Sequence, residues 1–122
     1  MSTPKNLKYT ASHEWIEVDG DKAKIGITEY ASTAMGDIVF VDLPEVDDEV
    51  EMEEAICDIE SVKSVSPMIS PVTGKIIAIN EALEDEPELI NAKPYESWII
   101  EVEFSEIGDT LTAAEYDALE KE

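Results

Sequence analysis

The chain has 122 residues, 43% of them hydrophobic, which is enough for one domain with a buried core. Thirty acidic residues face eight lysines and no arginine, giving a formal charge of −22. Such a surface repels the phosphates of nucleic acids and anionic membranes, and it favours partners with basic patches. Because there is also no membrane-length apolar run and no signal or transit pattern at the start, we expect a cytoplasmic protein.

The first expected structural unit is a β-hairpin over residues 7–27. Polar and apolar residues alternate along its first strand, and residues 19–20 supply the Asp-Gly pair that hairpin turns prefer. Thr28 can cap a short helix over 29–35, and Gly36 stands where a left-handed residue would end that helix.

The rest of the chain predicts further strands and two helical segments. Runs rich in β-branched residues predict strands at 37–43, 55–59, from Val65 toward a turn at 71–74, at 75–80, and at 98–104. Residues 81–91 predict a short helical turn plus loop. A C-terminal helix is expected over about 112–120, because Thr112 and Glu115 form a capping box and Leu111 and Tyr116 a hydrophobic staple.

A weak internal repeat relates the two middle portions of the chain. The segments 36–42 and 74–80 match at a spacing of 38 residues, and each precedes an acidic loop and another apolar strand. This pattern suggests two similar β-halves joined by the hairpin that carries Lys63. We therefore expect a small sandwich or flattened barrel with peripheral helices.

Few residues could catalyse a reaction. His13 is the only histidine and Cys57 the only cysteine, so they cannot assemble a zinc cluster, and no third group is evident to orient a Cys–His pair. Cys57 falls in an apolar strand, where a small core residue is expected. The acidic runs lack the ligand spacing of a calcium loop. We expect neither a metal site nor an enzyme.

The residues around Lys63 favour a covalent carrier. A lysine at an exposed turn can form an amide with a carboxylic-acid cofactor, which makes a long arm on a stiff base. Ser61 and Ser64 are small and leave the amine open, and Glu60 could be recognised by the attaching enzyme. The alternatives are that Lys63 only makes the turn soluble and that Glu60 is one more surface acid.

The ordered set of motifs resembles the H proteins of the glycine cleavage system over nearly the whole chain. The matching segments include Ser12-His13-Glu14-Trp15, Met35-Gly36-Asp37-Ile38-Val39-Phe40-Val41-Asp42-Leu43-Pro44, Glu60-Ser61-Val62-Lys63, Ser70-Pro71-Val72-Thr73-Gly74 and Pro87-Glu88-Leu89-Ile90-Asn91. The resemblance implies a mainly-β, lipoyl/biotinyl-like barrel-sandwich hybrid comprising residues 1–122 as one carrier domain. It also implies lipoate attached covalently to Lys63, with Glu60, Ser61, Val62 and Ser64 as the recognition turn.

The same resemblance implies the partners. The arm would accept an aminomethyl group from a pyridoxal-phosphate glycine decarboxylase and present it to a tetrahydrofolate-dependent aminomethyltransferase. A dihydrolipoamide dehydrogenase would then reoxidise the arm, which a lipoate ligase or octanoyltransferase first installs. Ser12 and Glu14 would line the groove in which the loaded arm rests. At Pro67 family members commonly have aspartate, and at Ala34 some have histidine.

Two alternative functions remain open at this stage. One is a relay protein that passes lipoyl or octanoyl groups to other lipoyl domains. The other is an unmodified acidic interaction module that uses only the scaffold. For the glycine cleavage carrier we expect a monomer.

Overall fold

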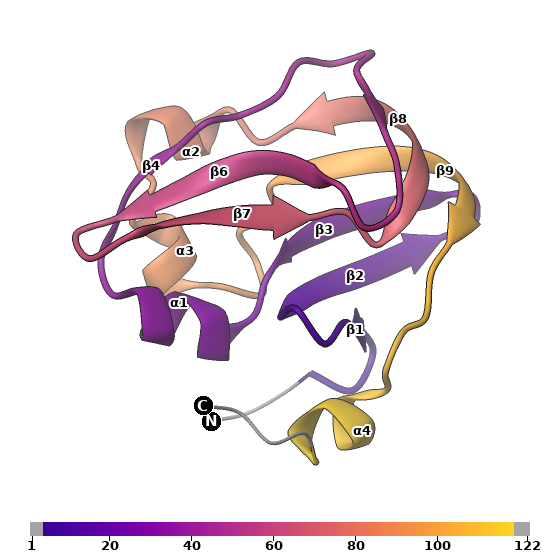
Figure 1. The fold of residues 1–122 in the computed structure, drawn as a ribbon, viewed down its shortest axis with the longest axis horizontal. Coiled ribbons are helices and arrows are strands. Elements are labelled where there is room, and N and C mark those ends of the chain that lie inside the picture. The colour runs from indigo at the N-terminus through magenta and orange to yellow at the C-terminus, as the bar shows by residue number, and fades with distance from the viewer. Residues whose placement is uncertain (1–3, 119–122) are drawn as a thin grey trace.

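The computed structural model describes residues 4–118, whose strands form two antiparallel sheets (Figure 1). The strands are β1 Lys8–Tyr9, β2 Glu14–Asp19, β3 Lys22–Ile27, β4 Ile38–Val41, β5 Glu49–Val50, β6 Ala55–Ser61, β7 Val65–Ile69, β8 Val72–Ile79 and β9 Ile100–Ile107. The helices are α1 Glu29–Met35, α2 Ala82–Asp85, α3 Leu89–Ala92 and α4 Ala113–Asp117. One sheet has the order β1-β2-β3-β9-β8-β5 and the other β4-β6-β7. The predicted mainly-β architecture with short peripheral helices is confirmed.

The N-terminal hairpin and the helix after it form as predicted. β2 and β3 pair antiparallel, and Gly20 lies in the turn between them with a φ of 65°. At the start of α1, Thr28 Oγ1 accepts a hydrogen bond of 3.2 Å from the amide of Ala31. Gly36 follows α1 with φ 81° and ψ −155°. This combination lies outside the expected left-handed helical region and is one that only glycine adopts readily.

The two halves of the internal repeat lie in different sheets. β4 pairs antiparallel with β6 in the three-stranded sheet, and β8 pairs antiparallel with β9 in the six-stranded sheet. Each member of the repeat therefore pairs with the apolar strand that follows its acidic loop. The β6–β7 hairpin leads directly into β8, so it carries the chain from the first half to the second.

The predicted turn at 71–74 is too long. β8 already begins at Val72, and Gly74 lies inside the strand. A Cβ at Gly74 would overlap the carbonyl oxygen of Glu103 in β9. Glycine is therefore needed for the close approach of two strands and not for a turn.

Two other boundaries differ from the prediction. Residues 81–91 contain two short helices, α2 and most of α3, on either side of Pro87, and not one helical turn plus loop. The last strand was predicted at 98–104, but β9 begins and ends later in the chain, at Ile100–Ile107. Trp98 precedes it, and its carbonyl oxygen accepts a hydrogen bond of 2.9 Å from Asn80 Nδ2.

The C-terminal helix α4 begins with the predicted capping box. Thr112 Oγ1 accepts a hydrogen bond of 3.2 Å from the amide of Glu115, and Glu115 Oε1 accepts one of 2.9 Å from the amide of Thr112. Leu111 packs against the cluster that contains Tyr116, as the staple predicts. Positions 119 and 120 of the predicted helix lie outside the described residues.

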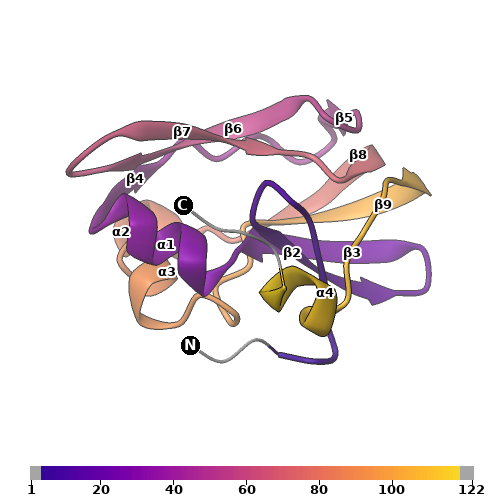
Figure 2. The ribbon, with the colours of Figure 1, turned by 60° about the horizontal axis from the view of Figure 1, so that its bottom comes forward.

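The main core fills the space between the two sheets (Figure 2). Both sheets contribute buried side chains to it, among them Ile38, Val41, Cys57, Ile59 and Met68 from the three-stranded sheet and Ile25, Val72, Ile76 and Val102 from the six-stranded sheet. Cys57 is therefore the small core residue that was predicted. A second cluster packs α4 against β1 and β2. Within residues 4–118 we find no helix with the length and apolar content needed to span a membrane.

Candidate functional site

The β6–β7 hairpin presents Lys63 at its tip. The amide of Ser61 donates to the carbonyl oxygen of Ser64 at 2.8 Å, and Ser61 Oγ accepts from the amides of Lys63 and Ser64 at 3.2 and 3.1 Å. One serine hydroxyl thus organises the turn, as Ser and Thr side chains often do. The amide of Val62 donates to the carbonyl oxygen of Asp37 at 3.0 Å, which ties the turn to the residue before β4.

The exposed Lys63 side chain lies over Gly36. A Cβ at Gly36 would be 3.3 Å from Lys63 Cε and 3.8 Å from its Nζ, so the glycine leaves room for the lysine. Within residues 4–118 the structure shows no ion pair for Lys63. Its amine is therefore open to an incoming carboxyl group.

The other residues of the predicted recognition turn lie beside the lysine. Val62 and Ser64 are exposed beside it, and Ser61 is half-buried. Glu60 lies one residue before the turn, opposite Phe40 of β4 on one side and Val65 of β7 on the other. The structure brings Lys63 and the four predicted recognition residues together at one end of the three-stranded sheet, and it shows that Ser61 also stabilises the turn.

Ser12 and Glu14 meet where the loop after β1 enters β2. Glu14 is only 3% exposed, and its Oε1 accepts hydrogen bonds from Thr10 Oγ1 at 2.7 Å and Ser12 Oγ at 2.6 Å. Burial raises the pKa of the Glu14 carboxyl above its ordinary value, while hydrogen bonds from Ser12, Thr10 and the backbone of Ile69 lower it. A buried carboxyl group held by two hydroxyls is suited to receiving a cation.

A groove of about 290 Å³, here called the α1 groove, connects this carboxyl with the hairpin. It is lined by residues of the β1–β2 loop, β2, β3, α1, β6 and β7, namely Ser12, His13, Glu14, Ile27, Tyr30, Ala31, Ala34, Met35, Ile59, Ser66 and Pro67. Glu14 bears the only carboxyl group among these described lining residues. Met35 is adjacent to Gly36, against which Lys63 Cε and Nζ lie, so the groove runs close to the outer end of the lysine side chain.

A larger cavity of about 790 Å³ shares Ser12 and Glu14 with the α1 groove but extends away from the hairpin tip. It is lined by Ile69 at the far end of β7, whereas the α1 groove is lined by Ser66 near the turn. These two residues are separated by about 10 Å along an extended strand. The α1 groove is therefore the hollow that a group attached to Lys63 meets first.

Sequence patterns missed two parts of this site. Thr10 was not singled out. Its hydroxyl reaches the Glu14 carboxyl, four residues later, because the loop between β1 and β2 is tight. Gly36 was expected only to end a helix, and its contact with Lys63 joins residues from separate elements. His13 is half-buried with a φ of 72°, and its Nδ1 lies 2.8 Å from the Tyr116 hydroxyl oxygen. Residues 4–118 contain no cluster of side chains that could hold a metal ion.

Comparison with known proteins gives one consistent result. The family model of the glycine cleavage H-protein matches residues 7–122. A glycine cleavage system H protein of Bacillus licheniformis is 50% identical over 126 residues, covering 100% of this chain and 99% of the relative. One from Geobacillus sp. is 49% identical with the same coverage. The crystal structure of a glycine cleavage system H protein from Mycobacterium marinum has a TM-score of 0.89 and 41% identity, covering 93% of this chain and 95% of that chain.

These similarities cover both the scaffold and the site. The matched region includes the N-terminal hairpin, the Lys63 turn and α4. Proteins of this family carry lipoate covalently on a lysine and act as non-catalytic carriers in glycine cleavage, and the relay and interaction-module alternatives are not favoured. The chain belongs to the glycine cleavage H-protein family and is a lipoyl carrier of that system.

Proposed function

We propose that Lys63 is the lysine that carries the lipoate, within one carrier domain formed by residues 1–122. The observation that supports this most strongly is the exposed Lys63 amine on a turn fixed by Ser61 and tied to Asp37. A stiff turn under a flexible side chain gives the arm a fixed origin and a wide reach. Gly36 leaves the lysine side chain unobstructed.

The attachment requires one amide bond between Lys63 Nζ and the carboxyl group of lipoate. Once bound, the lipoyl group supplies a disulfide that accepts an aminomethyl group or a pair of electrons. The protein supplies only position and recognition. Its exposed turn, comprising Glu60, Ser61, Val62 and Ser64 around the lysine, is the surface that a lipoate ligase or octanoyltransferase would contact.

Intact-mass measurement tests this attachment site. Wild-type protein and a Lys63→Arg variant are purified from the same lipoate-supplied host, with Lys75→Arg as the matched control because Lys75 is also exposed. We expect the wild type and Lys75→Arg to show the lipoyl mass increment and Lys63→Arg to show none. An increment that persists in Lys63→Arg contradicts the assignment.

The α1 groove is the proposed resting place of the amine-loaded arm. It runs close to the outer end of the Lys63 side chain, and among its described lining residues only Glu14 has a carboxyl group. Ionised Glu14 attracts a protonated amine, and the hydroxyls of Thr10 and Ser12 keep the carboxyl in place. Pro67 lines the same groove but offers no charge, so Glu14 supplies the electrostatic attraction by itself.

The rate at which the loaded protein loses its amine in buffer tests this role. We expect Glu14→Gln to lose the amine several-fold faster than the wild type, because a neutral amide attracts a cation less strongly than a carboxylate. Glu17→Gln is the matched control, since Glu17 lies on the same strand and is exposed. Equal rates for the two variants would place the loaded arm elsewhere.

We further propose that the protein works as a cytoplasmic monomer with the partners named above. Bacterial relatives that align over 100% of this chain and 99% of their own length support the assignment to a bacterial metabolic system. Sedimentation velocity at micromolar concentration and fractionation of the host cell check the two statements, and a stable dimer or a membrane-associated fraction contradicts them.

A further inference from the structure

Exposed apolar side chains gather around the hairpin tip. Four of the seven large hydrophobic residues that are exposed in the described structure lie there: Val39 at 53%, Phe40 at 46%, Val62 at 66% and Val65 at 56% exposure. We call these four residues the tip patch. Figure 2 shows that no helix or strand covers the outer side of the three-stranded sheet that carries it. The other exposed apolar residues are scattered.

A β-bulge in β4 produces half of this patch. Ile38 and Val41 are both buried although they are three residues apart, whereas a regular strand alternates its faces every residue. The pairing with β6 shifts between Ile38 and Phe40, so Val39 is the extra residue of a bulge. Both Val39 and Phe40 are consequently exposed, where regular alternation would bury one of them.

The remaining members are brought together by pairing and by the turn. Phe40 lies opposite Glu60, and Glu60 lies opposite Val65, so these three residues form a row across the sheet. Val62 is held at the same end by the hydrogen bond from its amide to Asp37. The patch therefore encloses the base of Lys63.

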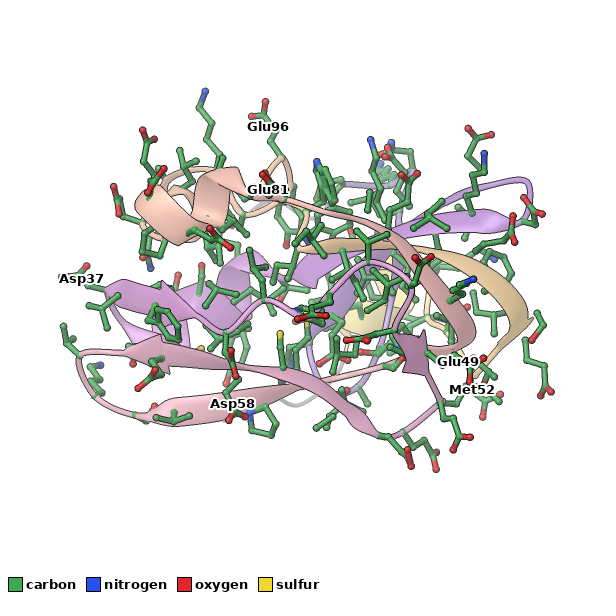
Figure 3. The ribbon with its side chains drawn as sticks, turned by 90° about the horizontal axis from the view of Figure 1, so that it is seen from above. Asp37, Glu49, Met52, Asp58, Glu81 and Glu96 are labelled. Atoms are coloured by element: carbon green, nitrogen blue, oxygen red, sulfur yellow. The ribbon has the colours of Figure 1, made fainter. Side chains whose placement is uncertain are left out.

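Acidic side chains border the tip patch. Asp58 lies two residues before Glu60 on β6 and pairs with Pro67, and Figure 3 shows it on the outer side of the sheet, while Asp37 lies at the hairpin end. Lys63 is the only basic residue between positions 37 and 69. Formation of the amide removes its charge. In the lipoylated protein, therefore, the charged side chains that border the apolar centre between positions 37 and 69 are all acidic.

We propose that the tip patch is the docking surface for the pyridoxal-phosphate glycine decarboxylase, which binds it through an apolar surface bordered by lysine or arginine. The inference rests on the proposed role of Lys63, because an enzyme that takes in the arm must cover the residues around its base. Buried apolar residues at the centre of an interface provide most of its affinity. The acidic border adds steering and orientation.

Binding of lipoylated protein to immobilised decarboxylase tests the patch directly. We expect the double variant Phe40→Ser/Val65→Ser to raise the Kd, and the KM for the carrier, by about tenfold with kcat unchanged. Val18→Ser removes an exposed valine from the six-stranded sheet and should stay within about twofold of the wild type. Phe40→Leu should preserve binding because it keeps an apolar side chain. Thermal unfolding confirms that each variant is folded.

The charge border has its own measurement. We expect the Kd of the wild type to rise with salt, and Asp58→Asn to reduce that dependence. Equal Kd values for Phe40→Ser/Val65→Ser and Val18→Ser, at full lipoylation by mass, overturn the docking proposal and leave the assignment of Lys63 standing. A wild type without the lipoyl increment overturns the assignment of Lys63 instead. If the double variant only converts a dimer into a monomer and leaves Kd unchanged, the patch binds a second copy and the proposal is wrong.

Discussion

Replacing Gly36 with alanine tests how the base of the arm is built. The backbone at Gly36 is held on both sides. Its amide donates to the carbonyl oxygen of Ser32 at 3.1 Å, and its carbonyl oxygen accepts from Asn91 Nδ2 at 2.8 Å. Asn91 Oδ1 also accepts from the amide of Ile38 at 2.8 Å. Because these bonds span the residue, the backbone has little freedom to move to a conformation that alanine prefers.

The cost of the substitution follows from this geometry. A residue with a Cβ held at φ 81° and ψ −155° is strained by about 1–3 kcal/mol. The new methyl group would also stand 3.3 Å from Lys63 Cε, so the lysine side chain must shift slightly. We expect Gly36→Ala to lower the free energy of unfolding by about 2 kcal/mol, which corresponds to a fall in Tm of roughly 8 °C for a domain of this size.

Urea unfolding followed by tryptophan fluorescence measures this loss. Gly20→Ala is the matched control, because Gly20 has a φ of 65° with nothing within 4 Å of the added methyl group, and we expect a loss of about 1 kcal/mol. Lipoylation of Lys63 should persist in both variants, since the lysine remains exposed. If Gly36→Ala loses no more stability than Gly20→Ala, the hydrogen bonds from Asn91 do not restrain Gly36 and the reasoning is refuted.

Three further predictions concern single side chains of the site and the core. In urea titrations, Ser61→Ala should lose about 1 kcal/mol because two turn amides lose their acceptor, whereas Ser64→Ala should change stability by less than about 0.5 kcal/mol. The raised pKa of Glu14 means that this carboxyl binds its proton more tightly in the folded protein than in the unfolded chain, so the stability of the wild type falls as pH rises from the ordinary pKa through the raised one. The stability of Glu14→Gln relative to the wild type should therefore increase across that pH range, and a difference that does not depend on pH contradicts this. Burial raises the pKa of the Cys57 thiol to about 12, so Ellman's reagent should react slowly with native protein and fast in urea, and fast native labelling would contradict its burial.

Local chemistry explains which elements could be predicted from the sequence. The capping box at Thr112 and the turn at Gly20 depend on residues a few positions apart, and both appear as expected. Gly74 was placed in a turn because glycine favours turns, but its actual requirement comes from Glu103 on β9. A contact between residues 29 positions apart leaves no trace in the local pattern.

In the candidate site, too, some features follow from neighbouring residues and others depend on contacts between distant parts of the chain. Lys63 was predicted at a hairpin tip because two apolar runs flank a short polar segment, and the hairpin forms there. The resemblance to the family implied that Ser12 and Glu14 line one groove, but the local sequence did not show that Glu14 receives a backbone hydrogen bond from Ile69 of β7. The β4 bulge was not anticipated either. It is visible only when Ile38 and Phe40 are paired with β6.

The acidic residues of this chain lie in two different dielectric environments, and the salt dependence of their interactions distinguishes the two. Asp58 on the rim of the tip patch is exposed, so at physiological ionic strength ions screen most of its attraction to basic groups more than about 8 Å away. Glu14 is buried, so ions screen its attraction to an amine in the α1 groove much less. Raising salt from about 0.05 to 0.5 M should therefore increase the KM of the decarboxylase for the carrier several-fold while the rate of amine loss from the loaded protein stays constant. If both quantities change together, Glu14 is reached by solvent ions and does not hold the amine in a protected groove.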